Sequence, residues 1–185
     1  AAPGTPPEPA GALEAPSSEE APGLADPVIR QCCAPGSILM CASRDGDVLK
    51  VWDLGTGSSR AFGSNAGLVS SLCTSGSLLF AGSCSGNVVV WDLASGECLR
   101  HLEACTEVRV MVANAQHLFA GYDGGAVRVW SVATGELVHI LLEDSLFEIG
   151  IAALVLVGDN LFVGNTAGVV TVWSISALRQ DQIYD

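Results

Sequence analysis

Cysteine and histidine are the residue types in this chain with the most varied chemistry, since they act as nucleophiles, metal ligands and proton carriers. The seven cysteines are odd in number, and no two of them have the C-x2-C spacing of a zinc site. The three histidines are dispersed, and none has a carboxylate or a cysteine at ligand spacing. We therefore expect small buried thiols of a reducing compartment, with no metal and no cofactor. The residues are Cys32, Cys33, Cys41, Cys73, Cys84, Cys98, Cys105, His101, His117 and His139.

Two short motifs invite an enzymatic interpretation. The segment GSCSG at residues 82–86 places Cys84 where a nucleophile elbow has its nucleophile, but that motif works on a turn from a strand to a helix. The segment NVVVWDL that follows has the composition of a strand, so a hairpin tip is favoured. The segment GTGSS at residues 55–59 lacks the lysine of a phosphate-binding loop, because the only lysine, Lys50, lies in an expected strand. The sequence predicts no enzyme.

The charge distribution argues against nucleic acid as a partner. The net charge is −12 and the eight lysines and arginines are scattered, whereas affinity for nucleic acid needs clustered cations. Residues 1–27 hold seven of the eight prolines, five acidic residues and no basic residue, which is typical of a disordered acidic tail. This tail has neither the basic start nor the apolar stretch of a signal peptide. We therefore expect a cytoplasmic or nuclear protein that is not secreted.

The longest apolar run is IGIAALVLVG at residues 149–158. It is ten residues long, whereas a membrane-spanning helix needs about 20 apolar residues. The run therefore predicts a buried strand and no membrane segment.

Four tryptophans recur along the chain, and valine precedes each of them. The intervals between them are 39, 39 and 43 residues. Their segments read VLKVWDL, NVVVWDL, AVRVWSV and VVTVWSI, which are rich in β-branched residues. Self-similarity at such a period indicates a repeat architecture. The tryptophans are Trp52, Trp91, Trp130 and Trp173.

A second recurring segment lies upstream of each tryptophan. It has a leucine, a large apolar residue, a small residue and then Ala42, Gly82, Gly121 or Gly164. A slot restricted to glycine or alanine beside a bulky residue predicts that another backbone approaches closely there. Turns such as Asp123-Gly124 join this segment to the tryptophan strand as a hairpin. With one apolar segment before the hairpin and one after it, each period holds four short antiparallel strands.

Both faces of the tryptophan strand are mostly apolar. Alternation along the strand places the valine on one face and the indole on the other. A sheet that is apolar on both faces needs a neighbour on each side, and four-stranded units that stack face to face form a radial array of blades. The sequence therefore predicts an all-β fold, a partial β-propeller of about four four-stranded antiparallel blades, over residues 28–185.

The VWDL segments at residues 51–54 and 90–93 resemble the WD40-repeat family, and the resemblance covers residues 28–185. It implies that each tryptophan packs into its blade. It also implies that Asp53 and Asp92, which follow two of the tryptophans, cap the exit of their strands.

Two departures from the family pattern concern polar groups. Ser131 and Ser174 stand where the dipeptide has aspartate. The histidine of the family's Gly-His pair is missing from the connections between the repeats. The hydrogen-bond network that this histidine joins in the family therefore cannot form in the same way, and we expect blades held mainly by packing.

The number of repeats raises the question of closure. Four blades are the lower limit for a closed propeller. An open array leaves apolar blade faces and unpaired strand edges, which favour association. We therefore expect part of a larger protein, or a ring completed by another copy or partner, with a closed four-bladed ring as the alternative.

The expected function is that of a non-catalytic scaffold or adaptor that binds proteins or peptides through loops at one end of the propeller. Arginine and aromatic residues are favoured at interfaces, and the hairpin turns and blade connections carry the candidates. One alternative is a substrate-recognition module of a ubiquitin-ligase or signalling complex. Another is a propeller-type enzyme or a metal-dependent redox protein. The candidate contact residues are Arg44, Asn65, Tyr122, Asp123, Phe147 and Asn165.

Overall fold

The computed structural model consists of antiparallel strands and one short 3-10 helix. It describes residues 29–33, 38–43, 48–63, 67–104, 106–141 and 149–179. The acidic segment at residues 1–27, for which the sequence predicts disorder, lies outside these ranges. No helix in the described ranges is long and apolar enough to cross a membrane. The predicted all-β class is confirmed.

Consecutive strands form four sheets, which we call blades 1 to 4 in chain order. Blade 1 contains β1 (Ile29–Cys33), β2 (Ile38–Ser43), β3 (Val48–Asp53) and β4 (Ser59–Gly63). Blade 2 contains β5 (Val69–Ser75), β6 (Leu78–Ser83), β7 (Val88–Asp92) and β8 (Cys98–Leu102). Blade 3 contains β9 (Val108–Ala113), β10 (His117–Tyr122), β11 (Val127–Ser131) and β12 (Leu137–Leu141). Blade 4 contains β13 (Ile151–Val157), β14 (Asn160–Asn165) and β15 (Val170–Ser174).

Blade 4 differs from the other three because it has three strands among the described residues, where the sequence analysis expected four. After β15 the chain enters the 3-10 helix η1 (Ala177–Arg179). Residues 176–182, SALRQDQ, lack the β-branched and aromatic residues that favour a strand. The outer strand that β4, β8 and β12 provide elsewhere is therefore missing from the described part of blade 4.

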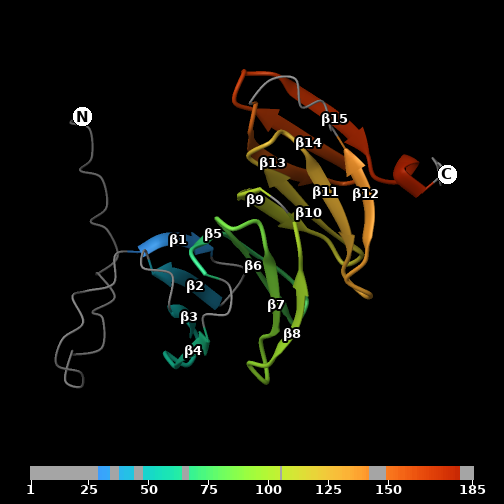
Figure 1. Ribbon diagram of the computed structural model, residues 1–185. Helices are drawn as coiled ribbons and strands as arrows, with labels where there is room; N and C mark the ends of the chain where they lie inside the picture. The colour runs from blue at the N-terminus through green and yellow to red at the C-terminus, as the bar shows by residue number, and fades with distance from the viewer. Residues whose placement is uncertain are drawn as a thin grey trace, which may run out of the picture.

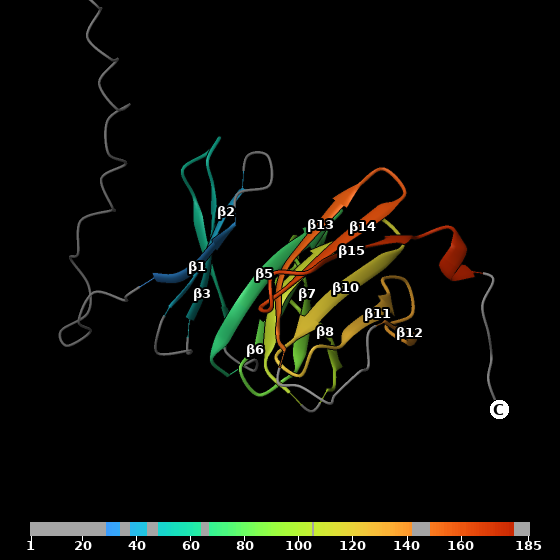
Figure 2. The same ribbon diagram turned by 90° about the horizontal axis from the view of Figure 1, so that it is seen from above.

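The blades stand side by side in an arc. The first strand of each blade, β1, β5, β9 or β13, packs against the first strand of the next blade. These four are therefore the inner strands. Blade 1 stands at one end of the arc and blade 4 at the other (Figures 1 and 2). This arrangement is a partial β-propeller, as the sequence predicts.

Apolar side chains fill the space between successive blades. We call the blade face that carries the valine before the tryptophan the back face, and the face that carries the tryptophan the front face. The back face of each blade packs against the front face of the next, so Val90 of blade 2 shares a core with Trp130 of blade 3. The three cores between blades contain, among others, Met40, Leu49, Leu79 and Trp91, then Phe80, Val90, Leu118 and Trp130, then Phe119, Val129, Ile151 and Leu161.

The glycine of the upstream segment lies directly under a neighbouring side chain. A Cβ built on Gly82 would lie 2.5 Å from Cγ1 of Val108, the first residue of β9. A Cβ built on Gly121 would lie 2.5 Å from Cγ2 of Ile151, the first residue of β13. The sequence analysis expected a neighbouring backbone at this slot. The structure corrects that expectation, because the nearest group is a branched side chain of the next blade.

The back face of blade 4 is exposed, in contrast to the back faces of blades 2 and 3. Val172 is 56% exposed, whereas the equivalent Val90 and Val129 are 2% and 1% exposed. Val155 and Val157 on β13 are also exposed, at 51% and 58%. The prediction that residues 149–158 form a buried strand is therefore only partly right, because the described chain has no fifth blade to cover this face.

The residue after each tryptophan organises the next turn. Asp92 Oδ1 accepts hydrogen bonds from the backbone N–H groups of Ala94 and Ser95, at 3.0 and 2.7 Å. Asp53 Oδ1 accepts equivalent bonds from Gly55 and Thr56, at 2.8 and 3.0 Å. Both aspartates therefore cap the exits of their strands, as the resemblance implies.

The two serines that replace this aspartate behave differently from each other. Ser131 Oγ still accepts a hydrogen bond from the N–H of Thr134, at 3.2 Å. Ser174 Oγ instead donates to the carboxylate of Asp159, at 2.9 Å. Serine therefore keeps the cap in blade 3, whereas blade 4 uses a carboxylate from another turn.

Candidate functional site

A β-bulge occurs at the second residue of every inner strand. In β5 the pairing with β6 skips from Val69 to Ser71, and in β13 the pairing with β14 skips from Ile151 to Ala153. The same irregularity occurs in β1 and β9. A bulge leaves one residue out of the ladder and changes the direction of its side chain. The four residues at this position are Arg30, Ser70, Arg109 and Ala152.

An open cavity lies where the bulges are. Its volume is about 340 Å³, and its lining comes from three successive inner strands and the residue before β9. We call it the mouth cavity. It lies on the side of the blades where the inner strands begin. Its lining residues are Ser70, Glu107, Arg109, Ile151 and Ala152.

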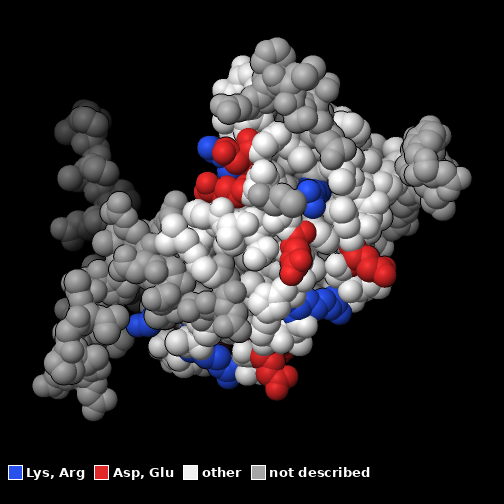
Figure 3. Space-filling model, viewed as in Figure 1, with Lys and Arg blue, Asp and Glu red and all other residues white. Residues whose placement is uncertain are grey.

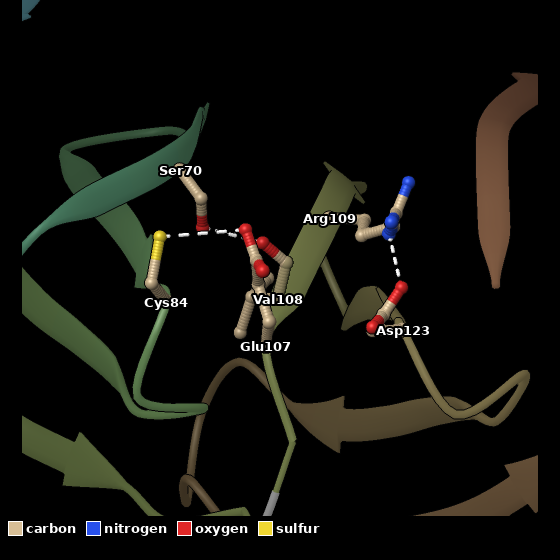
Figure 4. A network of polar contacts seen from close by, with 6 residues as sticks. All are labelled: Ser70, Cys84, Glu107, Val108, Arg109 and Asp123. Carbon is tan, nitrogen blue, oxygen red and sulfur yellow. Dashed lines mark hydrogen bonds and ion pairs between the residues drawn. The ribbon is translucent and has the colours of Figure 1, made fainter.

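Ser70 links blade 2 to blade 3 beside this cavity. Its hydroxyl lies 3.2 Å from the carbonyl oxygen of Gly82, and it also contacts the carbonyl oxygen of Val108 (Figure 4). A hydroxyl has one proton to donate, so the two carbonyls share it. The bulge residue of one blade is thus tied to the first strand residue of the next.

Two further polar pairs surround the cavity. The Cys84 thiol donates to Glu107 Oε1 at 3.3 Å, and this bond joins the β6–β7 turn to the connection that leads into β9. Arg109 Nε donates to Asp123 Oδ1 at 2.5 Å, within blade 3. These side chains come from a hairpin turn, a blade connection and an inner strand, and they converge at the same end of the fold (Figure 4). The cavity wall therefore offers both an anionic and a cationic group.

Backbone hydrogen bonds hold the hairpin turns against the entries of the inner strands. The N–H of Cys84 donates to the carbonyl of Leu68 at 2.9 Å, and the N–H of Asp123 donates to that of Glu107 at 3.0 Å. In blade 4 the N–H of Thr166 donates to Gly150 at 2.9 Å. The turns around the mouth cavity are thereby fixed to the rigid blades, which suits a recognition surface.

Of the residues predicted to contact a partner, Asp123 lies on the β10–β11 turn, and Asn165 is the last residue of β14, directly before the β14–β15 turn. Asp123 is exposed and pairs with Arg109. Asn165 Oδ1 accepts hydrogen bonds from the N–H groups of Ala167 and Val169, at 3.1 and 3.0 Å. Asn165 therefore stabilises its own turn.

Tyr122 is not available to a partner. Its side chain is 1% exposed and belongs to the core between blades 2 and 3. Burial raises the pKa of its phenol above the ordinary value, and the nearby Trp130 and Arg128 oppose that shift. The prediction that Tyr122 contacts a partner is therefore wrong, because the ring fills the gap between two blades. The other three candidates, Arg44, Asn65 and Phe147, lie outside the described residues.

Sequence reasoning missed Ser70, Glu107 and Arg109 as site residues. A signal was present, because Arg109 and Ser70 are polar residues near the starts of otherwise apolar strands. An alternating pattern assigns such residues to one face of a strand and does not reveal a bulge. The candidate list therefore favoured the loops over the inner strands.

The described cysteines have very different environments. Cys73 is 8% exposed, Cys84 is half-buried and Cys98 is exposed. The expectation of uniformly buried thiols is therefore wrong for Cys98, whose outer strand faces solvent. In the described ranges, no three His, Cys, Asp or Glu residues are grouped closely enough to hold a metal ion.

Charged side chains of both signs are interspersed on the face seen in Figure 3, among large uncharged areas. The ion pair between Arg109 and Asp123 leaves both side chains about half exposed, at 44% and 50%. The lining of the mouth cavity likewise contains both a carboxylate, Glu107, and a guanidinium, Arg109.

Structure comparison finds solved proteins with the same architecture. The computationally designed Ika8 protein matches with a TM-score of 0.71 and 25% identity, over 80% of this chain and 46% of the Ika8 chain. The computationally designed Ika4 protein matches with a TM-score of 0.71 and 25% identity, over 82% of this chain and 93% of the Ika4 chain. A chain in the crystal structure of a Mitotic Checkpoint Complex matches with a TM-score of 0.66 and 23% identity, over 74% of this chain and 45% of that chain.

The chain thus spans about half the length of Ika8 and of the checkpoint-complex chain. Comparisons with protein-family models and with curated proteins give no match. The structural matches agree with the arc of antiparallel blades described above. The chain has the fold of a partial β-propeller.

Proposed function

We propose that this chain is a non-catalytic scaffold or adaptor that binds a protein or peptide at the mouth cavity. The observation that carries the proposal is the convergence of Ser70, Glu107 and Arg109 on one open cavity of about 340 Å³. A carboxylate and a guanidinium set in a partly apolar wall can fix the orientation of a bound peptide through hydrogen bonds and charge.

The rigidity of the surroundings supports this role. The turns and the inner strands at the cavity are held by backbone hydrogen bonds, by the Ser70 hydroxyl and by the contact of Cys84 with Glu107. A preorganised surface loses less conformational entropy when it binds a partner.

The likeness to the WD40-repeat family gives further support. The valine-tryptophan strands and the caps at Asp53 and Asp92 are the features that this resemblance implies, and the structure contains both. One structural neighbour is a chain of a Mitotic Checkpoint Complex, which is a multiprotein assembly. We infer that this chain is a WD40-type module and that it likewise acts by contacting other proteins.

The test is a quantitative pull-down from cell extract with the double variant Glu107→Ala, Arg109→Ala. Both side chains line the cavity, and the ion pair of Arg109 is half exposed, so its loss costs the fold less than about 1 kcal/mol. We expect the variant to fold normally and to lose specific partners that the unmodified chain retains.

The matched control is Glu97→Ala, which removes an exposed carboxylate from the turn between β7 and β8, at the opposite end of the blade. This variant should retain every partner. If the double variant captures the same proteins in the same amounts as the Glu97 control, the mouth cavity is not the binding surface.

A further inference from the structure

The back face of blade 4 repeats a surface that is buried elsewhere in the same molecule. Val170 is 65% exposed, whereas Val88 and Val127, at the same register position in blades 2 and 3, are 0% exposed. Val172 shows the same contrast with its counterparts, and Val155 adds a further 51% exposed side chain on this face. Large exposed apolar patches on soluble proteins mark interaction sites.

The glycine slot on this face is also open. A Cβ built on Gly164 would meet only Ala153 of its own blade, at 3.7 Å. At Gly82 and Gly121 the same slot is covered by the first residue of the next inner strand, Val108 or Ile151. The back face of blade 4 therefore has the form of a surface that receives the front face of another blade.

At the opposite end of the arc, no described blade covers the front face of blade 1. Leu39 of blade 1 is half-buried, whereas Leu79, Leu118 and Leu161, at the same position in the other blades, are 0% exposed. Trp52, which pairs with Leu39, lies on the same face and is half-buried. In blade 1, Ile29 holds the register position at which Val108 and Ile151 begin their strands.

We propose that the back face of blade 4 binds the front face of blade 1 of a second copy of this chain. The contact would repeat the three interfaces already present between blades 1 and 2, 2 and 3, and 3 and 4. A leucine and a tryptophan would again cover two valines.

A second copy accounts for both uncovered faces at once. Head-to-tail contacts form a closed ring when the rotation between the copies closes. Two chains of four blades give eight, which is within the range of about four to eight blades for propellers. This chain matches 93% of the Ika4 chain, which is therefore of similar length. It matches 46% of the Ika8 chain, so the same arc also occurs in a chain about twice as long.

This inference is independent of the proposed role of the mouth cavity, because the residues on the two blade faces do not line that cavity. The first experiment is sedimentation velocity of the complete 185-residue chain over a range of concentrations. We expect a discrete species of twice the chain mass of 19.0 kDa. A chain that stays monomeric at every concentration, or that forms open-ended polymers, would overturn the proposal.

The second experiment places charge on the back face of blade 4. The double variant Val170→Glu, Val172→Glu should be monomeric and keep the circular dichroism spectrum of the unmodified chain, because both side chains already face solvent within one copy. The matched control is Val138→Glu, Ile140→Glu on β12, where the side chains are 42% and 39% exposed but lie on an outer strand. This control should remain dimeric. If it becomes monomeric, added negative charge anywhere on the surface prevents association, and the back face of blade 4 has no special role.

The third experiment distinguishes head-to-tail pairing from pairing of two blade 4 faces. Leu39→Glu changes only the front face of blade 1, so it should abolish the head-to-tail dimer. Gly164→Ala adds one methyl group that a single copy accommodates, and it should weaken the dimer without unfolding the chain. A folded Leu39→Glu variant that remains dimeric would contradict the head-to-tail arrangement.

Discussion

Gly121 of β10 lies beneath Ile151 of β13, so closely that a Cβ on the glycine would stand 2.5 Å from the isoleucine Cγ2. The same relationship joins Gly82 to Val108 one blade earlier. Real Cβ atoms do not approach other carbons so closely, so alanine at either position would push two blades apart. The repeated glycine therefore sets the distance between neighbouring blades where the inner strands begin.

We predict that Gly121→Ala destabilises the chain by about 1 to 3 kcal/mol, as overpacking of a well-packed core generally does. The measurement is the free energy of unfolding from a denaturant titration. The control is Gly63→Ala at the end of β4, where a Cβ would meet nothing within 4 Å. Equal stability of the Gly121 and Gly63 variants would show that the blades adjust without cost.

A second prediction concerns acid. Hydrogen bonds from the backbone and the hydroxyl of Ser95 lower the pKa of Asp92 below its ordinary value of 3.8. Because the folded-state pKa is the lower one, the stabilisation by this group is complete above the ordinary value and is lost as the pH falls through the folded-state value. Asp92→Ser keeps a neutral cap of the kind that Ser131 provides in blade 3, so it should unfold with a weaker dependence on pH below about 4.

The check for Asp92 is the midpoint of thermal unfolding, measured from about pH 6 to about pH 3. Glu97→Gln is the control, since it removes an exposed carboxyl group on the same turn. If Asp92→Ser and the unmodified chain lose stability in parallel as the pH falls, the cap does not carry the acid sensitivity.

Arg100 supports a third prediction, because it joins the outer strand of blade 2 to blade 3. Its Nη1 donates to the carbonyl of Val132 at 3.1 Å, and its side chain lies against Gly135. Arg100→Ala should lower the free energy of unfolding by about 1 kcal/mol through the lost hydrogen bond and the lost packing of the side-chain stem. The free energy of unfolding of Arg128→Ala, at another arginine of the blades, is measured for comparison. A loss of stability at Arg100 no larger than that of a typical surface substitution would contradict this role.

The thiols supply a fourth prediction. Cys98 is exposed on β8, whereas Cys73 is 8% exposed in the core between blades 2 and 3. Alkylation of the native chain followed by peptide mass spectrometry should modify Cys98 at least about tenfold faster than Cys73, because reagent access and thiolate formation both need solvent. Denatured chain is the control, in which the two rates should converge. Equal rates in the native chain would show that blades 2 and 3 separate readily.

Sequence reasoning predicted the blades well because the signals for them are local. The strands and their stacking follow from the four tryptophans, the valines before them and the apolar character of both faces. Within one blade, the structure pairs Trp91 with Leu79 and Val90 with Phe80. The caps at Asp53 and Asp92 were predicted from the family resemblance, and each aspartate, the last residue of its strand, accepts hydrogen bonds from the next turn.

The features that sequence missed depend on groups that are distant in the chain. Tyr122 was expected on the surface because it stands next to a turn, but the preceding blade, blade 2, covers it. The glycine slots were read as a close backbone approach, although the neighbour is the side chain of a residue about 26 to 30 positions later. The exposure of Val170 and Val172 could not be predicted either, because their sequence pattern equals that of the buried valines. They differ only in that no blade among the described residues covers them.

The bulge at the second residue of each inner strand is a position where the side chain can vary. The ladder on either side of the bulge keeps its pairing whatever side chain the extra residue carries, so arginine, serine and alanine all occur there in one chain. Ser70 is constrained because its hydroxyl ties blade 2 to blade 3, but substitutions at Arg109 and Ala152 would change the lining of the mouth cavity while the ladder keeps its pairing. An engineer could therefore treat them as a small set of variable positions on an otherwise constant frame.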